Sequence, residues 1–304
     1  MSVSRNFAQC AEAFLVKGLV GLLSVLPVAV ASRLGGGLAG LIGPFLSVSR
    51  KVGDANLRLV MPELSATDRT SIIKKVWVNL GQTAAELTKL RSLKEVKIDS
   101  GKPGYTLEGW EENVLPYLTQ GKPAIFFTGH LANWEVMPLM AHARGLDFGF
   151  IYRAASNRSV DNILQKLRRS CYGDDVKMFP KGAAGGKAAY AHLSKGGVLG
   201  LLVDQKLDTG LSIPFFGKPA MTMDAMASFA LRFGCPVFPV HVRRLGPARL
   251  QVISDPPLAL PQTGNRNEDI LTLSKDMNCV VEGWIRQQPQ DWLWLHKRWP
   301  AQPR

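Results

Sequence analysis

The stretch AIFFTGHLANWE, residues 124–135, decides the fold expected for this chain. Its first five residues form a short apolar run that is typical of a buried strand, and Gly129 then permits a sharp turn. Helix-like sequence follows over residues 133–144. His130 is therefore expected at the carboxyl end of a strand, where open α/β sheets place their ligands.

Strand-like and helix-like segments alternate on both sides of this stretch. Further strands are predicted at residues 148–152, 197–204, 236–243 and 248–253. Further helices are predicted at residues 66–93, 159–171, 183–195, 222–233 and 267–287. The alternation predicts an α/β fold with a sheet between layers of helix. No repeat, low-complexity tract or linker interrupts residues 50–304, which are expected to form a single domain.

The first fifty residues differ in composition from the rest. Residues 18–49 carry one charge, Arg33, in an apolar run long enough for one spanning helix or two shorter segments. One straight helix is disfavoured by Pro27, the glycines at 35–37 and Pro44. Residues 1–49 are therefore predicted to anchor the chain in a membrane as a helix or helical hairpin. A signal peptide ending near Ala31 and a buried core hairpin are the alternatives.

The charge of the chain indicates an anionic partner. Lysine and arginine number 37 and aspartate and glutamate 24, so the 304 residues carry a net charge of +13. Residues 151–200 alone hold nine basic and three acidic side chains. An anionic membrane, an acidic carrier protein or an acidic substrate would suit this charge. Nucleic acid is not expected, because no helix-turn-helix, zinc-finger or RNP-like pattern is present.

His130 and Glu135 form a His-x4-Glu pair that suits general-base chemistry. On a regular helix the two side chains would point about 140° apart. If His130 lies in the turn before the helix, the chain can bring the carboxylate to the imidazole. Glu135 would then orient His130, which would accept a proton from a hydroxyl. The alternative is a satisfied histidine beside an unrelated glutamate.

Other catalytic patterns are missing from the sequence. No GxSxG marks a serine hydrolase, and no HExxH or other ligand cluster marks a metal site, so no metal is expected. The glycine-rich stretch KGAAGGK, residues 181–187, is not a Walker A sequence and is expected to lead into a helix. The four cysteines have no CxxC spacing and no nucleophile signature, so no acyl-enzyme is expected.

Several blocks, in this order, resemble the lipid A biosynthesis acyltransferases of the late lauroyl/myristoyl type, which are relatives of the glycerolipid acyltransferases. The blocks are His130 with Glu135; Tyr152, Arg153 and Asn157; Arg168; the segment from Gly197 to Asp204 and Gln205; Pro214 to Gly217; and the terminal WLWLHKRW, residues 292–299. The resemblance covers nearly the whole chain.

The resemblance implies a mixed sheet flanked by helices, as in glycerolipid acyltransferases. It also implies acyl transfer from acyl-acyl carrier protein to a hydroxyl of a phosphorylated, acylated glucosamine disaccharide, the lipid A precursor. No cofactor is implied. The expected partners are acyl carrier protein, the lipid A precursor and the lipids of the inner membrane. The catalytic domain is expected on the cytoplasmic face, because the donor is cytosolic.

Five further residues belong to the site that the resemblance implies. Attack on a thioester creates an oxyanion, for which Arg168 or a backbone N–H near Gly129 is the candidate donor. Arg153 is expected to contact substrate or to pair with a carboxylate. Asp204 is expected either to orient an arginine or to touch substrate. The remaining residues that match the motif are Tyr152 and Asn157.

Two other functions and one other feature stay open at this point. A glycerophospholipid or lysophospholipid acyltransferase would use similar chemistry on a smaller acceptor. A catalytically silent membrane-binding protein would not need the His-x4-Glu pair. The tryptophans at 292, 294 and 299 suit either a membrane-interface belt or ordinary core packing.

Overall fold

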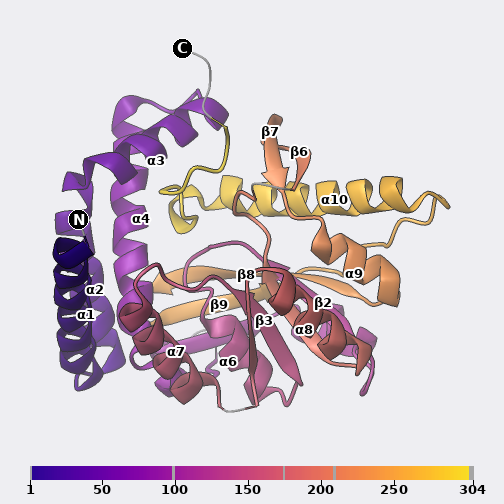
Figure 1. Cartoon of the computed structure of the whole chain (residues 1–304), viewed down its shortest axis with the longest axis horizontal. Helices are drawn as coiled ribbons and strands as arrows, with labels where there is room; N and C mark the ends of the chain where they lie inside the picture. The colour runs from indigo at the N-terminus through magenta and orange to yellow at the C-terminus, as the bar shows by residue number, and fades with distance from the viewer. Residues whose placement is uncertain (1, 98–99, 174, 208–209, 301–304) are drawn as a thin grey trace.

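The computed structural model describes residues 2–97, 100–173, 175–207 and 210–300. A seven-stranded mixed sheet lies at its centre in the order β1-β9-β8-β2-β5-β3-β4, and helices cover both faces (Figure 1). Its strands are β1 Gly104–Glu108, β2 Ala124–Thr128, β3 Phe148–Tyr152, β4 Lys177–Pro180, β5 Val198–Leu202, β8 Val237–Gly246 and β9 Arg249–Ser254. The predicted α/β fold with a helix-flanked mixed sheet is confirmed.

Each predicted helical segment corresponds to a helix of the described residues, and two further helices, at 47–60 and 110–113, were not predicted. They are α1 Ser2–Ser24, α2 Val28–Ile42, α3 Ser47–Val60, α4 Ala66–Leu87, α5 Trp110–Asn113, α6 Val136–Ala143, α7 Arg158–Tyr172, α8 Ala183–Ser194, α9 Ala225–Phe233 and α10 Arg266–Gln287. Short 3-10 turns lie at Gly43–Phe45, Leu90–Ser92, Leu115–Tyr117 and Pro289–Asp291. The helix predicted at 66–93 begins at a capping box made by Ser65 and Asp68 and ends at Leu87.

The middle of the sheet is parallel, which places several strand ends at one edge. Strand β2 pairs in parallel with β5 and β8, and β3 pairs in parallel with β5 and β4. All five residues of β2 are buried, as expected for a central parallel strand. Thr128 lies opposite Leu202 at the carboxyl end. The loop that begins at Gly129 therefore lies at the edge where a ligand is expected.

Four strands were not predicted from the sequence. Strand β4 has a single buried residue, Phe179, because it is the edge of the sheet and lacks a long apolar run. Strand β1 lies at the opposite edge and begins at a glycine. Strands β6 Leu211–Phe215 and β7 Lys218–Thr222 form a separate antiparallel hairpin. The turn of this hairpin lies within the block Pro214–Gly217 that the family resemblance singled out. That block therefore has a structural role as the turn between two strands.

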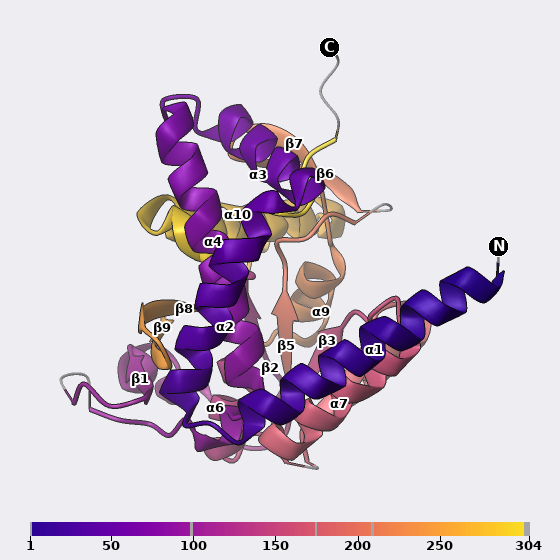
Figure 2. The same cartoon turned by 90° about the vertical axis from the view of Figure 1, so that its left-hand side faces the viewer.

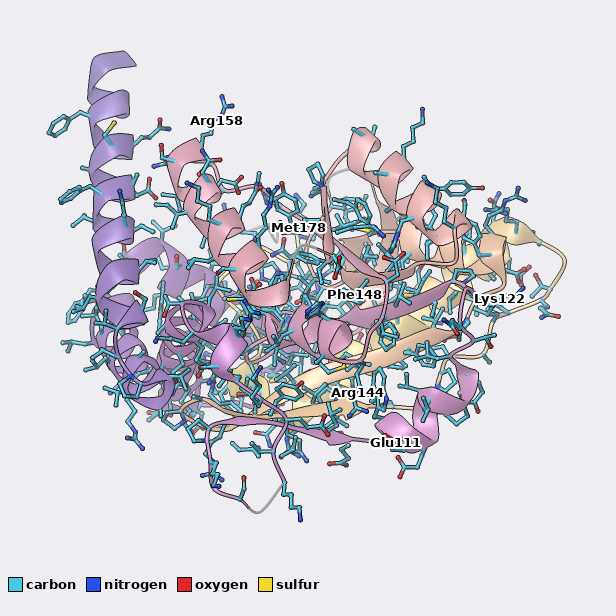
Figure 3. All side chains as sticks on the ribbon, turned by 90° about the horizontal axis from the view of Figure 1, so that it is seen from below. Glu111, Lys122, Arg144, Phe148, Arg158 and Met178 are labelled. Atoms are coloured by element: carbon cyan, nitrogen blue, oxygen red, sulfur yellow. The ribbon has the colours of Figure 1, made fainter. Side chains whose placement is uncertain are left out.

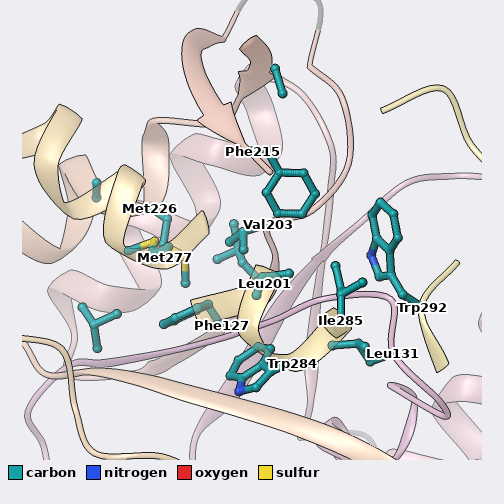
Figure 4. Packing of buried hydrophobic residues seen from close by; sticks show 14 of the residues in the cluster. Phe127, Leu131, Leu201, Val203, Phe215, Met226, Met277, Trp284, Ile285 and Trp292 are labelled. Atoms are coloured by element: carbon teal, nitrogen blue, oxygen red, sulfur yellow. The ribbon is translucent and has the colours of Figure 1, made fainter. Parts of the chain in front are cut away.

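The three tryptophans of the C-terminal segment belong to the core. Trp292 and Trp294 have no exposed surface and Trp299 is 5% exposed, so the membrane-interface interpretation is wrong. They pack with Phe215 and Phe216 of the hairpin, and Figure 4 shows Trp292 and Phe215 in the same cluster. This cluster lies on the face covered by α8, α9 and α10. A second cluster lies on the face covered by α5, α6 and α7.

The two N-terminal helices combine a face packed on the protein with an exposed apolar face. Figure 2 shows α1 beside α7 and α2 beside α4. Helices α2 and α4 approach so closely that a Cβ at Gly81 would lie 2.2 Å from the carbonyl oxygen of Gly35. The exposed large apolar side chains of the two helices include Phe7, Phe14, Leu15, Leu22, Leu34, Leu38 and Leu41. Both apolar segments are long enough to cross a membrane and fit a membrane anchor.

The N-terminal helices are also bonded to the rest of the fold. Ser32 of α2 donates a hydrogen bond of 2.6 Å from its hydroxyl to Glu86 of α4. Asn157, which begins α7, donates from its side-chain amide to the carbonyl of Gln9 and to the carboxylate of Glu12, at 2.8 Å each. Contacts therefore cross residue 49, and the division into an anchor and a single domain remains a prediction.

Candidate active site

The loop from Gly129 to Glu135 is held from several sides. His130 lies in a turn before α6, as the interpretation of the His-x4-Glu pair required. Ala132 has a φ of 46°, in the left-handed region, and its N–H donates to the carbonyl of Asp291 at 2.9 Å. Thr83 donates from its hydroxyl to the carbonyl of Ala132 at 3.0 Å. These contacts hold a strained backbone in one conformation beside His130.

His130 is oriented by Asp204. The His130 Nδ1 and an Asp204 carboxylate oxygen are 2.8 Å apart, and the His130 backbone N–H donates to the other oxygen at 2.7 Å. Trp292 donates from its indole nitrogen to that second oxygen, also at 2.7 Å. Burial alone would raise the pKa of Asp204, but the charge of the His130 imidazole and the two hydrogen bonds from His130 hold the pKa well below its usual value. Asp204 is therefore an anion, and Nδ1 of His130 carries a proton.

The second ring nitrogen of His130 is the basic atom. The side-chain nitrogen of Gln205 lies 3.1 Å from His130 Nε2. An amide nitrogen only donates, so Nε2 presents its lone pair. His130 and Gln205 both line a cavity at this edge of the sheet. The imidazole thus has one nitrogen fixed by a carboxylate and the other directed toward a place where substrate can reach it.

Glu135 contacts a different partner from the one expected. Arg168 donates to its two oxygens from Nε at 3.1 Å and from Nη2 at 2.6 Å, and Tyr172 donates from its hydroxyl. The predicted orientation of His130 by Glu135 is thus replaced by orientation through Asp204. Glu135 turns toward α7 because it directly precedes α6 and its own N–H is bonded to the Asn133 side chain at 3.1 Å.

The Glu135 cluster is ionised and faces the cavity. Burial would raise the pKa of Glu135, but the Arg168 charge and the Tyr172 hydrogen bond bring the pKa below its usual value. Burial and the Glu135 charge together raise the pKa of Tyr172, which stays protonated. Glu135 and Arg168 both line the cavity. Arg168 therefore lies on the cavity wall, with two of its nitrogens bound to Glu135.

The other predicted residues divide into two groups. Tyr152 and Arg153 line the cavity, and the Tyr152 hydroxyl accepts a hydrogen bond from Gln165 at 2.9 Å. Arg153 is exposed at the rim. Asn157 does not line the cavity, because its side chain caps α7 by accepting from the Ser159 N–H at 3.0 Å and also binds α1. Asn157 is thus a structural residue that the motif placed in the site.

The cavity has a volume of about 610 Å³ and changes character with depth. Polar and charged residues line one part of it: His130, Glu135, Arg153, Arg168, Lys181, Gln205 and Lys206. Apolar residues line other parts of it, among them Phe126, Met137, Pro138, Phe148, Phe150 and Gly200. In Figure 3, which shows the molecule from below, Phe148 lies near the centre of the view, and its side chain is buried. Such a cavity suits a substrate with a polar head and an apolar chain.

Sequence reasoning missed the network behind the Gly129–Glu135 loop. Glu86 of α4 has no exposed surface and accepts from Arg244 at 2.5 and 3.1 Å, and from the side chain of Asn133 at 2.7 Å. Asn133 stands between His130 and Glu135 in the sequence, so this network holds the middle of the loop. No local signal marked Glu86, which lies 47 residues from Asn133. Among the residues that the structure describes, no group of His, Cys, Asp and Glu could hold a metal ion.

The fold places a histidine–carboxylate pair beside a cavity that is lined by both charged and apolar side chains. The model of the bacterial lipid A biosynthesis acyltransferase family matches residues 2–301, and the chain belongs to this family. It is similar to a lipid A biosynthesis lauroyltransferase of Escherichia coli K12, with 25% identity over 297 residues that cover 94% of this chain and 90% of that protein. The protein is therefore an acyltransferase of lipid A biosynthesis.

Proposed function

We propose that this enzyme transfers a fatty acyl chain from acyl-acyl carrier protein to a hydroxyl of an acylated, phosphorylated glucosamine disaccharide. His130 is the general base, Asp204 orients it, and no acyl-enzyme forms. The observation that carries this proposal is the His130 Nε2 directed to a cavity whose far part is apolar. A base with an orienting carboxylate and no protein nucleophile suits direct transfer to an alcohol.

The proposed reaction proceeds in two bond changes. The acceptor hydroxyl takes the place of Gln205 at His130 Nε2, which accepts the proton as the hydroxyl oxygen bonds to the thioester carbon. The carbon–sulfur bond then breaks, and the leaving thiolate takes the proton from the imidazolium. The Asp204 anion, 2.8 Å from Nδ1, stabilises the imidazolium in between. The products are an ester and the free carrier thiol.

Charge near the reacting carbonyl is the second part of the proposal. Arg168 is the proposed oxyanion donor, since it lines the cavity and Glu135 holds its guanidinium in one place. The backbone N–H groups of His130 and Ala132 are bonded to Asp204 and Asp291, so they do not serve this purpose. Arg153 and Lys181 at the rim add positive charge that suits a phosphorylated acceptor or an acidic carrier protein.

The same assay tests the reaction and its acceptor. Purified full-length protein receives labelled acyl-acyl carrier protein with either the acylated disaccharide or a lysophospholipid, and mass spectrometry identifies the product. We expect product only from the disaccharide. His130→Ala should lower kcat by about 10²–10⁴, whereas His142→Ala, which removes an imidazole outside the cavity, should not. A product from the lysophospholipid alone would contradict the proposed acceptor.

The absence of a covalent intermediate has its own test. Donor supplied without acceptor should leave no stoichiometric acyl group on the protein, because the two buried cysteines, Cys171 and Cys235, are not among the residues that line the cavity. Burial raises the pKa of Cys235 to about 11, which disfavours the nucleophilic thiolate. A covalent acyl-protein that forms and decays at the turnover rate would contradict direct transfer.

We also propose that α1 and α2 hold the enzyme on the inner membrane with the cavity toward the cytoplasm. The exposed apolar side chains on the two helices support this location. Replacing Leu34, Leu38 and Leu41 by serine should release the protein from membranes while the α2 face packed on α4 is retained. Unchanged sedimentation of this variant with membranes would contradict anchoring by α2.

A further inference from the structure

One part of the apolar lining of the cavity follows the face of the sheet that α6 covers. In β2, β5 and β3 the side chains on this face form rows across the strands, because parallel partners point to the same side. One row contains Phe126, Gly200 and Phe150, and the row behind it contains Val198 and Phe148. Helix α6 covers the face with Met137 and Pro138. The cavity therefore follows the strand direction, from the carboxyl edge of the sheet inward.

The cavity ends at Phe148. Phe148 lines it, but Ala124 and Val198, which stand in register with each other at the depth of Phe148, do not. The ring of Phe148 leans forward over Gly200, so a Cβ at Gly200 would lie 2.4 Å from the ring. The ring thus fills the space that a larger residue at 200 would occupy. Tyr152, at the carboxyl edge, and Phe148 are four residues apart, about 13 Å along a strand.

We propose that Phe148, seated over Gly200, sets the greatest length of acyl chain that the enzyme accepts. The inference rests on the proposed function, since it places the donor chain in this cavity with its carbonyl near His130. A chain longer than the cavity would have to displace a ring that is 3% exposed and packed edge-on against Phe126. A tightly packed interior resists such displacement, so longer chains react more slowly.

Donor competition among saturated chains of increasing length tests this proposal. The full-length enzyme receives a mixture of acyl-acyl carrier proteins and the acylated disaccharide, and the ratio of products gives the ratio of kcat/KM values. Phe148→Leu should raise the long-to-short ratio by about tenfold or more, since a pocket discriminates a methylene by roughly 10–200-fold. Gly200→Ala should lower the ratio, because the added methyl pushes the ring of Phe148 into the cavity.

Phe238→Leu is the matched control. Phe238 is fully buried on the same face and its ring lies 4.9 Å from that of Phe126, but it does not line the cavity. It should lose thermal stability as Phe148→Leu does while the ratio of products stays at the wild-type value. A ratio that moves equally in Phe148→Leu and Phe238→Leu would show general loosening of the core and overturn the proposal.

The experiment separates this inference from the function on which it rests. If the wild-type enzyme transfers no acyl chain from any donor, the proposed function fails. If it transfers acyl chains and Phe148→Leu leaves the ratio of products unchanged, the proposed function stands and the role of Phe148 is wrong. Thermal unfolding of each variant verifies that a folded protein was assayed.

Discussion

Two carboxylate–guanidinium pairs lie close to the Gly129–Glu135 loop and differ in what surrounds them. Glu86 and Arg244 are 0% and 8% exposed at their side chains, and the two Glu86 oxygens accept from Arg244, Ser32, Asn133 and the N–H of Ala248. Glu135 and Arg168 are 8% and 16% exposed and line the cavity. The first pair is enclosed by protein, and the second meets the substrate space.

The difference shows that the same pair of residue types serves two purposes. The contacts of Glu86 go to α2, to β8, to the turn after β8, and through Asn133 to the loop itself. The contacts of Glu135 go to α7, and they leave Arg168 on the cavity wall. We therefore expect changes in the first pair to lower stability most and changes in the second to lower activity most.

The largest effect is expected from Glu86→Ala. This change leaves Arg244 buried without its anion, and breaking a buried pair from one side costs about 3–5 kcal/mol. Chemical denaturation of the detergent-solubilised protein measures it. Glu282→Ala is the control, because Glu282 also accepts a backbone N–H, from Phe216 at 2.5 Å, but it lies away from the loop. If the two variants lost equal free energy of unfolding, Glu86 would contribute no more to stability than Glu282 does.

The next largest effect is expected from Arg168→Lys. Lysine keeps the charge but loses the planar pair of donors that binds both oxygens of Glu135. Transfer should slow by about 10²-fold, the lower end of what loss of one oxyanion donor costs. The free energy of unfolding should fall far less than in Glu86→Ala. Normal turnover in Arg168→Lys would remove Arg168 from the oxyanion role and make the two pairs alike.

Tyr172→Phe should change the pH dependence of stability. The pKa of Glu135 is lowered in the folded protein, so its contribution is present above the unfolded pKa of about 4.3 and is lost as pH falls through the folded pKa. Removing the Tyr172 hydroxyl raises the folded pKa. Unfolding followed from about pH 6 to pH 3 should thus show the variant losing stability at higher pH than the wild type. If stability depended on pH in the same way in Tyr172→Phe and in the wild type, the Tyr172 hydroxyl would not lower the pKa of Glu135.

The smallest effect is expected at the rim. Arg153→Ala should slow transfer several-fold and weaken its dependence on salt, because an exposed charge acts mainly by attracting the substrate. Lys195→Ala is the control, since Lys195 is exposed at the end of α8 and does not line the cavity. Steady-state kinetics at two ionic strengths measures both. If Arg153 and Lys195 behave alike, the basic surface acts as a diffuse field.

Local patterns in the sequence predicted the central strands and the helices that cover them, but not the edge strands, the β6–β7 hairpin or the long-range contacts. The strand before Gly129 and the turn at His130 could be predicted because apolar runs and glycines act on near neighbours. The partner of His130 could not, because Asp204 is 74 residues away and only the parallel pairing of β2 with β5 brings the two together. Glu135 was the nearest carboxylate in the sequence, yet proximity along the chain did not decide the contact.

The protonation of the His130 ring tests the central claim most directly. Nitrogen-15 NMR of histidine-labelled full-length enzyme reports which ring nitrogen carries the proton, and a His130→Gln variant assigns the signal among the five histidines. In its neutral form, His130 should have a protonated Nδ1 and an unprotonated Nε2, in the wild type and in Glu135→Gln. Asp204→Asn should lose this preference. A protonated Nε2 in the wild type, or a preference lost in Glu135→Gln and kept in Asp204→Asn, would contradict orientation of the base by Asp204.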